Sequence, residues 1–466
     1  MTRPAMTRDT QAEGTGPEGQ GLTRQLAEQA LSFADADVPA DVAEIVRHCL
    51  LDWFSVALAA WNSPVVQAVG AWTAREPGAA QATLLDGPRV SMSQAALVNG
   101  TASHVLDFDD AHLPSRVHPS VPLWAAVLAL AEARNLSGRQ AMAAFVAGVQ
   151  VQSRLAAVMG NSHYGLGWHN TATLGTFGAT AAAARLEGLD GDRLCAAFGL
   201  AGTLAGGLRS VFGSGAKPLH AGRAAANGLM AAGLVGEGLE SVADILEKPG
   251  GYVQVYARDA DPAALARPPV PWELRRIVFK YHTSCYGTQA PIEAALALRG
   301  QAPPAPDSRV EVFIEPQYMS VCNIAEPVTA SQAKFSVAHM VALALAGRST
   351  TSDAELAGEG LRDPQVLAWR ARIRVRPDPA LPRAHARVVV HGPGGSREQS
   401  CDASQPQADL PLQRQRLLDK SSVLLAARYR PAAIEQAQQR LLEFDSQPAL
   451  RDWWRQLLGD LARARR

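Results

Sequence analysis

Apolar residues recur at steps of three and four along the first half of this chain. The spacing begins at Leu22 and continues in segments up to Gly238, and no stretch of useful length in this half alternates with the period of two expected for a strand. Alanine dominates the apolar residues and only 6% of all residues are aromatic, which is typical of closely packed helices. Helices are predicted over residues 22–31, 42–60, 93–108, 121–134, 138–159, 171–186, 191–205 and 220–238.

The pattern changes near the proline-rich residues 268–271. Residues 309–315, 371–376 and 384–391 alternate with period two and are predicted to be strands. The sequence Gly392-Pro-Gly-Gly395 predicts a hairpin turn into a further strand. Helical segments at residues 287–299 and 334–346 lie among these strands, so this part is predicted to be a smaller α+β domain.

The spacing becomes helical again after Pro411, with helices predicted over residues 412–427, 432–444 and 450–464. We expect these helices to return to the first domain. The predicted fold is therefore mainly α, with a large all-helical domain built from both chain ends (residues 22–270 and 405–466) and an α+β lid domain (residues 271–404). Residues 1–21, rich in Thr, Gly, Glu and Gln, are expected to form a mobile tail.

The equal numbers of basic and acidic residues argue against nucleic acid and anionic membranes as partners. The 466 residues include 44 Lys and Arg and 44 Asp and Glu, so no net field attracts nucleic acid or an anionic membrane. No apolar run reaches about 18 residues without polar interruption, so no membrane span is expected. The five cysteines are scattered, odd in number and without a Cys-x-x-Cys pair, which favours a reduced, cytoplasmic compartment.

Ionisable residues gather between two predicted helices, in residues 97–120. This segment holds three carboxylates, three imidazoles and one guanidinium: Asp107, Asp109, Asp110, His104, His112, His118 and Arg116. A carboxylate beside an imidazole suits proton transfer near neutral pH. A helix terminus with exposed acids and one core histidine is the alternative, and this segment alone leaves both interpretations open.

Three further segments carry candidate residues. His163 to Thr171 precedes a helix whose free N–H groups suit a carboxylate, although Thr171 could simply cap that helix. Lys217 lies in a glycine-rich loop that lacks the spacing of a phosphate-binding loop, so it would either neutralise a substrate carboxylate or remain solvated. Cys285, near Lys280, has no evident base to activate it and is expected to be a cleft residue rather than a nucleophile.

Other catalytic motifs are missing from the sequence. It contains no His-Glu-x-x-His or Gly-x-Ser-x-Gly motif and no Gly-x-Gly-x-x-Gly motif after a predicted strand, which leaves zinc hydrolase, serine hydrolase and dinucleotide-binding functions without support.

Taken together, motifs between about Leu50 and Ala346 resemble the MmgE/PrpD family. The motifs are Leu51-Asp52-Trp-Phe, Asn99-Gly100, Asp107-Phe-Asp-Asp110, His118-Pro-Ser120, Gly167-Trp-His169-Asn-Thr171, Lys217-Pro-Leu-His-Ala-Gly222, Lys280 with Ser284-Cys-Tyr286, and Ala333-Lys-Phe-Ser-Val337. The resemblance implies the two-domain fold, a homodimer and an interdomain site without metal or organic cofactor. At matching positions it implies the catalytic residues Asp107, His118, His169, Lys217 and Lys280. Tyr164 and Tyr318 are further candidates for substrate binding, beside Arg116 and Cys285.

The resemblance also implies a reaction class, removal of a proton from a carbon next to a carboxylate. Ala111 stands where the decarboxylase branch has Thr, and Cys285 and Gln289 stand where relatives carry His, which argues against cis-aconitate decarboxylation. We therefore expect a 2-methylcitrate dehydratase-type hydro-lyase acting on a small di- or tricarboxylate. An iminodisuccinate-type epimerase and a non-catalytic polycarboxylate-binding protein are the alternatives.

The expected mechanism divides the work among these residues. Lys217 and Lys280 would hold carboxylates and offset the charge of the carbanionic intermediate. Asp107 or His118 would take the proton, and His169 would deliver one.

Overall fold

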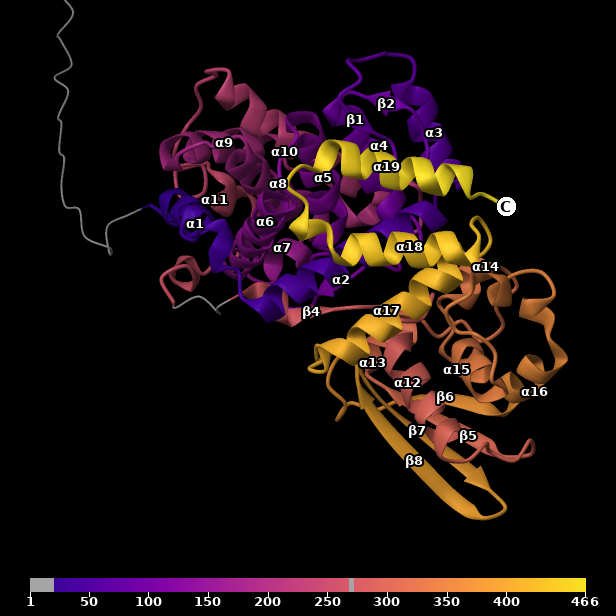
Figure 1. The fold of residues 1–466 in the computed structure, drawn as a ribbon. Helices are drawn as coiled ribbons and strands as arrows, with labels where there is room; N and C mark the ends of the chain where they lie inside the picture. The colour runs from indigo at the N-terminus through magenta and orange to yellow at the C-terminus, as the bar shows by residue number, and fades with distance from the viewer. Residues whose placement is uncertain (1–20, 268–271) are drawn as a thin grey trace, which may run out of the picture.

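The computed structural model describes residues 21–267 and 272–466. A large helical body carries a smaller lid, and the first and the last helices of the described chain both belong to the helical body (Figure 1). The mainly α fold class is confirmed. The tail predicted for residues 1–21 lies, apart from Gly21, outside the described residues.

The helical body contains the N-terminal helices and the last three helices of the chain. They are α1 (Leu22–Leu31), α2 (Ala40–Ala59), α3 (Pro64–Thr73), α4 (Met92–His104), α5 (Ser120–Arg134), α6 (Gly138–Met159), α7 (Ser162–Gly165), α8 (Asn170–Leu186), α9 (Gly191–Leu204), α10 (Ala216–Gly236), α11 (Tyr252–Tyr256), α17 (Leu410–Leu425), α18 (Pro431–Leu442) and α19 (Leu450–Arg463). Phe54 of α2 packs edge-on against Trp454 of α19, with ring centroids 5.8 Å apart. Both chain ends therefore share one hydrophobic core.

Two glycines set the approach of α4 to α10. A Cβ atom at Gly100 would lie 2.9 Å from the Cα atom of Gly222, and one at Gly222 would collide with the carbonyl oxygen of Leu97. Only glycine allows backbones this close. The contact places the first turn of α10, which carries Lys217, near the end of α4.

Helix α6 is the long apolar helix of this core. By length and composition alone it could cross a membrane, but 89% of its apolar window is buried among the other helices of the described chain. That burial is what a central helix of a packed body shows.

The lid combines a four-stranded sheet with helices. Its elements are α12 (Tyr286–Gln301), β5 (Arg309–Ile314), α13 (Pro316–Val321), α14 (Ala330–Ala333), α15 (Val337–Ala346), α16 (Pro364–Arg372), β6 (Ile373–Pro377), β7 (His385–Gly392) and β8 (Gly395–Asp402). The strand order is β6-β5-β7-β8, with β5 and β6 parallel and the other pairs antiparallel. Gly392 pairs with Gly395, so the predicted hairpin is confirmed.

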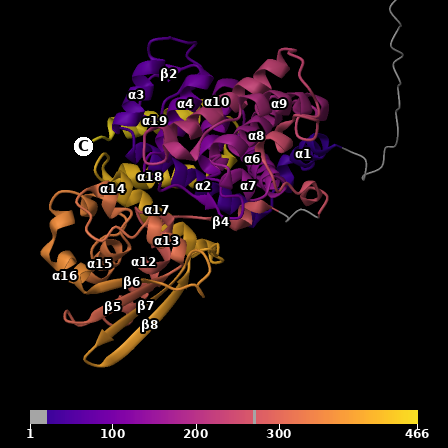
Figure 2. The ribbon, with the colours of Figure 1, turned by 180° about the vertical axis from the view of Figure 1, so that it is seen from behind.

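The lid has its own hydrophobic core, formed by residues between Ala290 and Val390. Viewed from either side, α17 lies at the junction between the helical body and the lid (Figure 2). The remaining short elements are the 3₁₀ helices Asp35–Asp37, Arg209–Val211, Pro262–Ala264, Glu273–Arg276, Asp353–Leu356, Gly360–Arg362 and Phe444–Ser446, and the strand pair β1 (Ala82–Thr83) and β2 (Arg89–Val90).

A second short strand pair was not predicted. Strand β3 (Ala111–His112) pairs antiparallel with β4 (Ile277–Val278), and each has only two residues, too few to show a period. This pair holds the segment after α4 beside the segment that carries Lys280. Helix α3 was also missed.

Two predicted helix boundaries next to the candidate site were wrong. The helix predicted to reach Phe108 ends at His104, and α10 begins at Ala216 rather than His220 because Pro218 fits the first turn of a helix. Thr171 is not the cap of α8, because that helix begins at Asn170 and follows His169.

Candidate active site

The loop that follows α4 begins the candidate site. Asp107 lies three residues beyond the helix end with a φ of 50°, in the left-handed region that short polar side chains tolerate best. This bend turns the Asp107 carboxylate toward α10 and β4, while Asp109 and Asp110 are buried behind it. Backbone strain of this kind concentrates at functional sites.

Two lysines from distant parts of the chain meet at the Asp107 carboxylate. The ammonium nitrogen of Lys217 lies 2.7 Å from Oδ1, and that of Lys280 lies 3.2 Å from the same oxygen. Lys280 also donates to the Asp107 carbonyl oxygen at 2.6 Å. The two ammonium groups outweigh burial and hold the pKa of Asp107 well below its usual range, so this carboxylate is a poor proton acceptor.

Asp109 holds two imidazoles. Its carboxylate lies 3.0 Å from Nδ1 of His104 and 2.8 Å from Nδ1 of His118, and its side chain is fully buried. The carbonyl oxygen of Asp110 lies 2.8 Å from the same nitrogen of His118. Since carboxylate and carbonyl oxygens only accept, Nδ1 of each imidazole must carry the proton, and each Nε2 carries the free lone pair.

Asp107 and His118, of which one was expected to take the proton, have different partners. His118 is paired with Asp109, and Asp107 is paired with the lysines. The His118 side chain is 19% exposed while the Asp109 side chain is at 0%, so His118 presents its Nε2 edge outward from a buried anion. His104 is buried, and burial lowers its pKa to about 4, so it is neutral at pH 7.

His169 lies beside this pair, at the start of α8. Its ring stacks on that of His104 with centroids 5.9 Å apart, and its Nδ1 lies 3.0 Å from Nδ1 of His220. Phe212 packs edge-on against His169 and is 5.4 Å from the Lys217 ammonium. Burial first, and then the charges around it, hold the pKa of His169 well below its usual value.

A buried ion pair between Lys420 and Asp52 holds two backbone segments of the site in place. Lys420 of α17 lies 2.6 Å from the carboxylate of Asp52, and both side chains are almost fully buried. Lys420 also donates to the carbonyl oxygens of Phe108 (2.6 Å) and Lys280 (2.8 Å). The C-terminal part of the chain thus fixes both segments that meet at Asp107.

His104, Asp107, Asp109 and His118 form a group that could be considered for a metal, since their potential ligand atoms lie within 4.8 Å of one another. The donor chemistry does not fit a cation. The Asp107 carboxylate is already paired with two ammonium groups, and Asp109 accepts from two imidazole N–H groups. A divalent ion would have to displace these partners and face the repulsion of both lysines.

The structure brings together all five residues predicted to be catalytic, either directly or through one shared neighbour. Two of the residues predicted to bind substrate contact each other, and the other two lie in the lid. Arg116 lies over the ring of Tyr164 at 5.1 Å, and Cys285 caps the start of α12 near Lys280 and Asp107. Tyr318 contacts the same region of the lid, since a Cβ at Gly287 would meet both Tyr318 and Cys322.

Gln289 and Ala111 have structural roles. The Gln289 amide accepts from the backbone N–H groups of Tyr281 and His282 and donates to the His282 carbonyl oxygen, so it shapes the loop after Lys280. Ala111 is buried in β3 and pairs with Val278.

Several site residues were not assigned a role from the sequence. Asp109 and His104 lie in the segment that was singled out, but their side-chain pairing depends on the turn at Asp107. His220 lies with Lys217 in the first turns of α10, and Phe212 lies in the loop before that helix, whose path no periodicity reveals. The signal that could have found His220 is its place in the Lys217-Pro-Leu-His motif.

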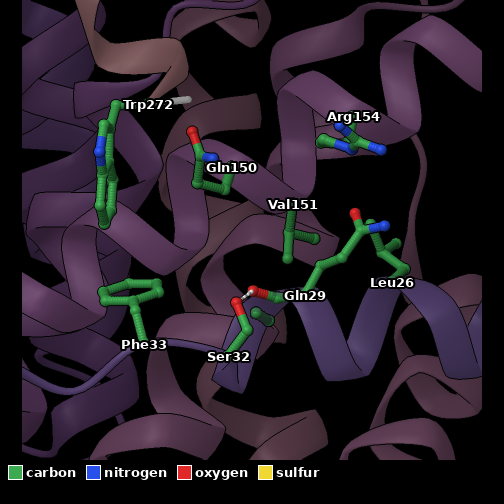
Figure 3. A pocket seen from close by; sticks show the side chains of 9 residues that line it. Leu26, Gln29, Ser32, Phe33, Gln150, Val151, Arg154 and Trp272 are labelled. Atoms are coloured by element: carbon green, nitrogen blue, oxygen red, sulfur yellow. Dashed lines mark hydrogen bonds between the residues drawn. The ribbon is translucent and has the colours of Figure 1, made fainter. Parts of the chain in front are cut away.

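A separate cavity of about 220 Å³ lies between α1, α6 and Trp272. Figure 3 shows Phe33 and Trp272 together on one side of it and Arg154 across from them. None of the predicted catalytic residues lines this cavity, so it is distinct from the site around Asp107.

Comparison with known families agrees with this geometry. The model of the MmgE/PrpD N-terminal domain matches residues 24–265, and that of the MmgE/PrpD C-terminal domain matches residues 282–444. The chain belongs to the MmgE/PrpD family. Membership in this family, suggested by separate motifs in the sequence, is thereby confirmed.

Relatives of known activity are identical to this chain at up to about a third of the aligned positions. A cis-aconitate decarboxylase-like protein of Aspergillus oryzae is 28% identical over 62% of this chain and 63% of its own length. The cis-aconitate decarboxylase of Aspergillus terreus is 28% identical over 61% of each chain, and that of Homo sapiens is 31% identical over 45% of each. The matched regions therefore cover less than two thirds of these relatives.

Proposed function

We propose that this protein is a lyase that removes a proton from a carbon next to a carboxylate of a small di- or tricarboxylate. The observation that carries the proposal is the meeting of Lys217 and Lys280 at Asp107, beside two imidazoles oriented by Asp109. This combination places fixed positive charge next to proton acceptors. The names of the relatives, cis-aconitate decarboxylases, support a polycarboxylate substrate.

The two lysines would act on the charge that develops during the reaction. When a proton leaves the carbon, its electron pair moves into the neighbouring carboxylate and forms an enediolate. Fixed ammonium groups with little exposure to water stabilise such an anion strongly. Asp109 and Asp107 keep Lys280 charged, because their attraction outweighs the cost of burial and raises its pKa.

His118 is the base in this proposal. Its Nδ1–H group is held by Asp109 and by the Asp110 carbonyl oxygen, which leaves Nε2 to accept the proton. The imidazolium that forms is stabilised by the buried Asp109 carboxylate. Asp107 is excluded from this role by the lysines that lower its pKa.

His169 would handle the second proton. It is neutral in the free protein, because burial holds its pKa well below the usual value. A substrate with several carboxylates adds negative charge, which favours the imidazolium and raises that pKa. A protonated His169 could then give its proton to a leaving hydroxyl group, which departs as water while the carbon–carbon double bond forms.

Dehydration is the outcome we favour among the reactions of this family. Ala111 is buried in β3 and has no hydroxyl group, and Cys285 stands where the decarboxylase branch has His. The product would be the unsaturated acid of a 2-methylcitrate dehydratase-type reaction. An iminodisuccinate-type epimerase would use the same base but return the proton to the opposite face.

Proton exchange tests the proposal. The protein is incubated in heavy water with 2-methylcitrate, citrate, cis-aconitate or iminodisuccinate, and NMR follows the carbon-bound protons and any new product. Exchange that disappears in His118→Gln but survives in the surface variant His391→Gln would support the proposal. Loss of water, loss of carbon dioxide and inversion are separate outcomes in the same spectra.

A result without exchange would overturn the catalytic assignment. If the acids raise the melting temperature but exchange no carbon-bound proton, the protein is a polycarboxylate-binding protein, the alternative from a different class. Arg116, Lys217 and Lys280 would serve in that function too.

A further inference from the structure

The cavity between α1, α6 and Trp272 contains an arginine that no carboxylate of the described chain neutralises. Arg154 of α6 is only 6% exposed. Its Nη2 donates to the carbonyl oxygens of Leu265 (2.7 Å) and Arg267 (3.4 Å), while its Nε is buried without a hydrogen-bond partner. Among the described residues, no ion pair joins Arg154 to an Asp or Glu. A buried charge without a counter-ion is costly, so an anion in the cavity would stabilise this position.

Glu273 does not supply that anion. Burial lowers the pKa of Arg154, and the charge of Glu273 offsets this only in part. One carboxylate oxygen of Glu273 lies 3.0 Å from Nε2 of His112 and 3.2 Å from Nη1 of Arg276. Glu273 is therefore committed to two other partners, and Arg154 lines the cavity without it.

Two aromatic rings form the wall across the cavity from Arg154 (Figure 3). Phe33 and Trp272 meet edge to face, with ring centroids 5.2 Å apart. Leu26 and Val151 add apolar side chains to the lining. Aromatic walls of this kind favour a ring that stacks or packs edge-on against them. The cavity thus has a cationic side and an aromatic side.

The size of the cavity limits what it can hold. A dry, apolar protein cavity of about 150 Å³ holds one benzene molecule. The cavity beside Arg154 measures about 220 Å³. It therefore has room for one six-membered ring and a small polar group attached to it.

Trp272 reaches the cavity through an unusual backbone conformation. Its φ of 68° lies in the left-handed region, which is rare for a bulky side chain and persists only where the surroundings hold it. The next residue, Glu273, donates its backbone N–H to Oε1 of Gln150 at 2.6 Å, and Gln150 also lines the cavity. Strand β4 and Lys280 follow. A molecule that contacts Trp272 and Gln150 would therefore hold the start of the segment that carries Lys280.

We propose that this cavity binds a small aromatic carboxylate, at a site separate from the catalytic residues. The carboxylate accepts charge-assisted hydrogen bonds from the guanidinium group of Arg154. The ring packs against Phe33 and Trp272. The proposal does not depend on the reaction proposed above, since none of the predicted catalytic residues lines the cavity.

Three small molecules separate the contributions of charge and ring. Benzoate carries both, benzyl alcohol keeps the ring without the charge, and acetate keeps the charge without the ring. Isothermal titration calorimetry at neutral pH should detect binding of benzoate to the wild type, and much weaker binding of the other two. Arg154→Met should weaken benzoate binding by about 10- to 100-fold, the worth of a hydrogen bond to a charged group.

Two variants control for other positive charges. Arg139→Met removes an exposed arginine from the start of the same helix, α6. Lys217→Met tests the competing location, because an ammonium group of the candidate active site would also attract a carboxylate. Both variants should bind benzoate as the wild type does. Lost affinity in Lys217→Met, unchanged affinity in Arg154→Met, equal binding of acetate and benzoate, or a wild type that does not bind benzoate would overturn the proposal.

Hydrogen exchange locates the ligand in the wild type, so that the test does not depend on the folding of a variant. Benzoate should slow amide exchange, followed by mass spectrometry, in residues 272–278 and leave residues 214–222, around Lys217, unchanged. Protection at residues 214–222 instead would overturn the proposal. Val151 is 1% exposed and lines the cavity, so Val151→Phe should fill the cavity and abolish both benzoate binding and the protection.

Discussion

Lys420 donates a hydrogen bond to the backbone carbonyl oxygen of Lys280 across 2.8 Å. The two residues are 140 positions apart, and the contact ties α17 to the segment that carries an ammonium group of the site. The same Lys420 neutralises Asp52 at 2.6 Å, and burial raises the pKa of Asp52 to about 6. The geometry of the candidate active site is therefore set in part by a helix from the far end of the chain.

Replacing Lys420 should destabilise the protein. In Lys420→Met the Asp52 carboxylate stays buried without its partner, which costs about 3–5 kcal/mol of unfolding free energy. Urea unfolding followed by circular dichroism measures the loss. The double variant Asp52→Asn/Lys420→Met removes the stranded charge and should recover part of the stability; equal stability of the single and double variants would contradict this account.

Replacing Lys217 should impair turnover and leave folding intact. Its side chain is 16% exposed, and its only ion pair in the described chain is with Asp107. Losing one charge that stabilises the enediolate is expected to lower kcat/KM by about 10³-fold. Steady-state kinetics and the melting temperature are compared with those of Lys248→Met, which removes a surface lysine. Wild-type turnover in Lys217→Met would remove this lysine from the mechanism.

Asp109→Asn should disturb the tautomers of His104 and His118 and thereby lower the reaction rate. An amide replaces one of the two carboxylate oxygens by a donor NH₂ group and removes the negative charge, so the N–H groups of His104 and His118 compete for one oxygen and face a competing donor. We expect kcat to fall by about 10²- to 10⁴-fold, the usual contribution of general acid–base catalysis. Nitrogen-15 NMR of the imidazoles reports the tautomers directly, and unchanged tautomers with unchanged kcat would show that Asp109 does not orient them.

His339 should make the lid sensitive to acid. It is buried in α15 with neither ring nitrogen hydrogen-bonded in the described structure, and burial lowers its pKa to about 4. The unfolded chain binds this proton near pH 6.5, so stability is fully present above that pH and is lost as the pH falls toward 4. The loss amounts to about 3 kcal/mol.

Urea unfolding at several pH values between 4 and 7 tests this. The variant His339→Leu should show a flatter dependence on pH than the wild type, and His391→Gln, at a half-buried histidine of the lid that already has Glu311 as partner, should show a smaller change. Parallel curves for the wild type and His339→Leu would assign the acid sensitivity to other groups.

Chelators should leave activity intact. The carboxylates of Asp107 and Asp109 are already paired with ammonium and imidazole groups, which leaves a metal little to bind. Dialysis against EDTA followed by an activity assay measures this. Activity that disappears and returns with an added divalent ion would show that a cation does displace those partners.

The sequence motifs were sufficient to identify the ionisable site residues that lie within them or next to them along the chain. Lys217 was found because it follows glycines at the start of a helix, and His169 because it precedes one. Lys420 was not found, because it lies in an ordinary amphipathic helix and its role depends on where α17 packs. The pairing of Ala111 with Val278 could not be predicted either, because strands of two residues are too short to show a period in the sequence.

The contact between Gly100 and Gly222 affects which substitutions the protein can tolerate. Neither glycine has a side chain to offer a substrate, yet a single methyl group at Gly222 would push α4 and α10 apart. Lys217 lies about one and a half helical turns before Gly222, so its ammonium would move with the helix. Substitutions that abolish function are therefore expected at glycine positions as well, where the absence of a side chain is itself what the packing of the two helices requires.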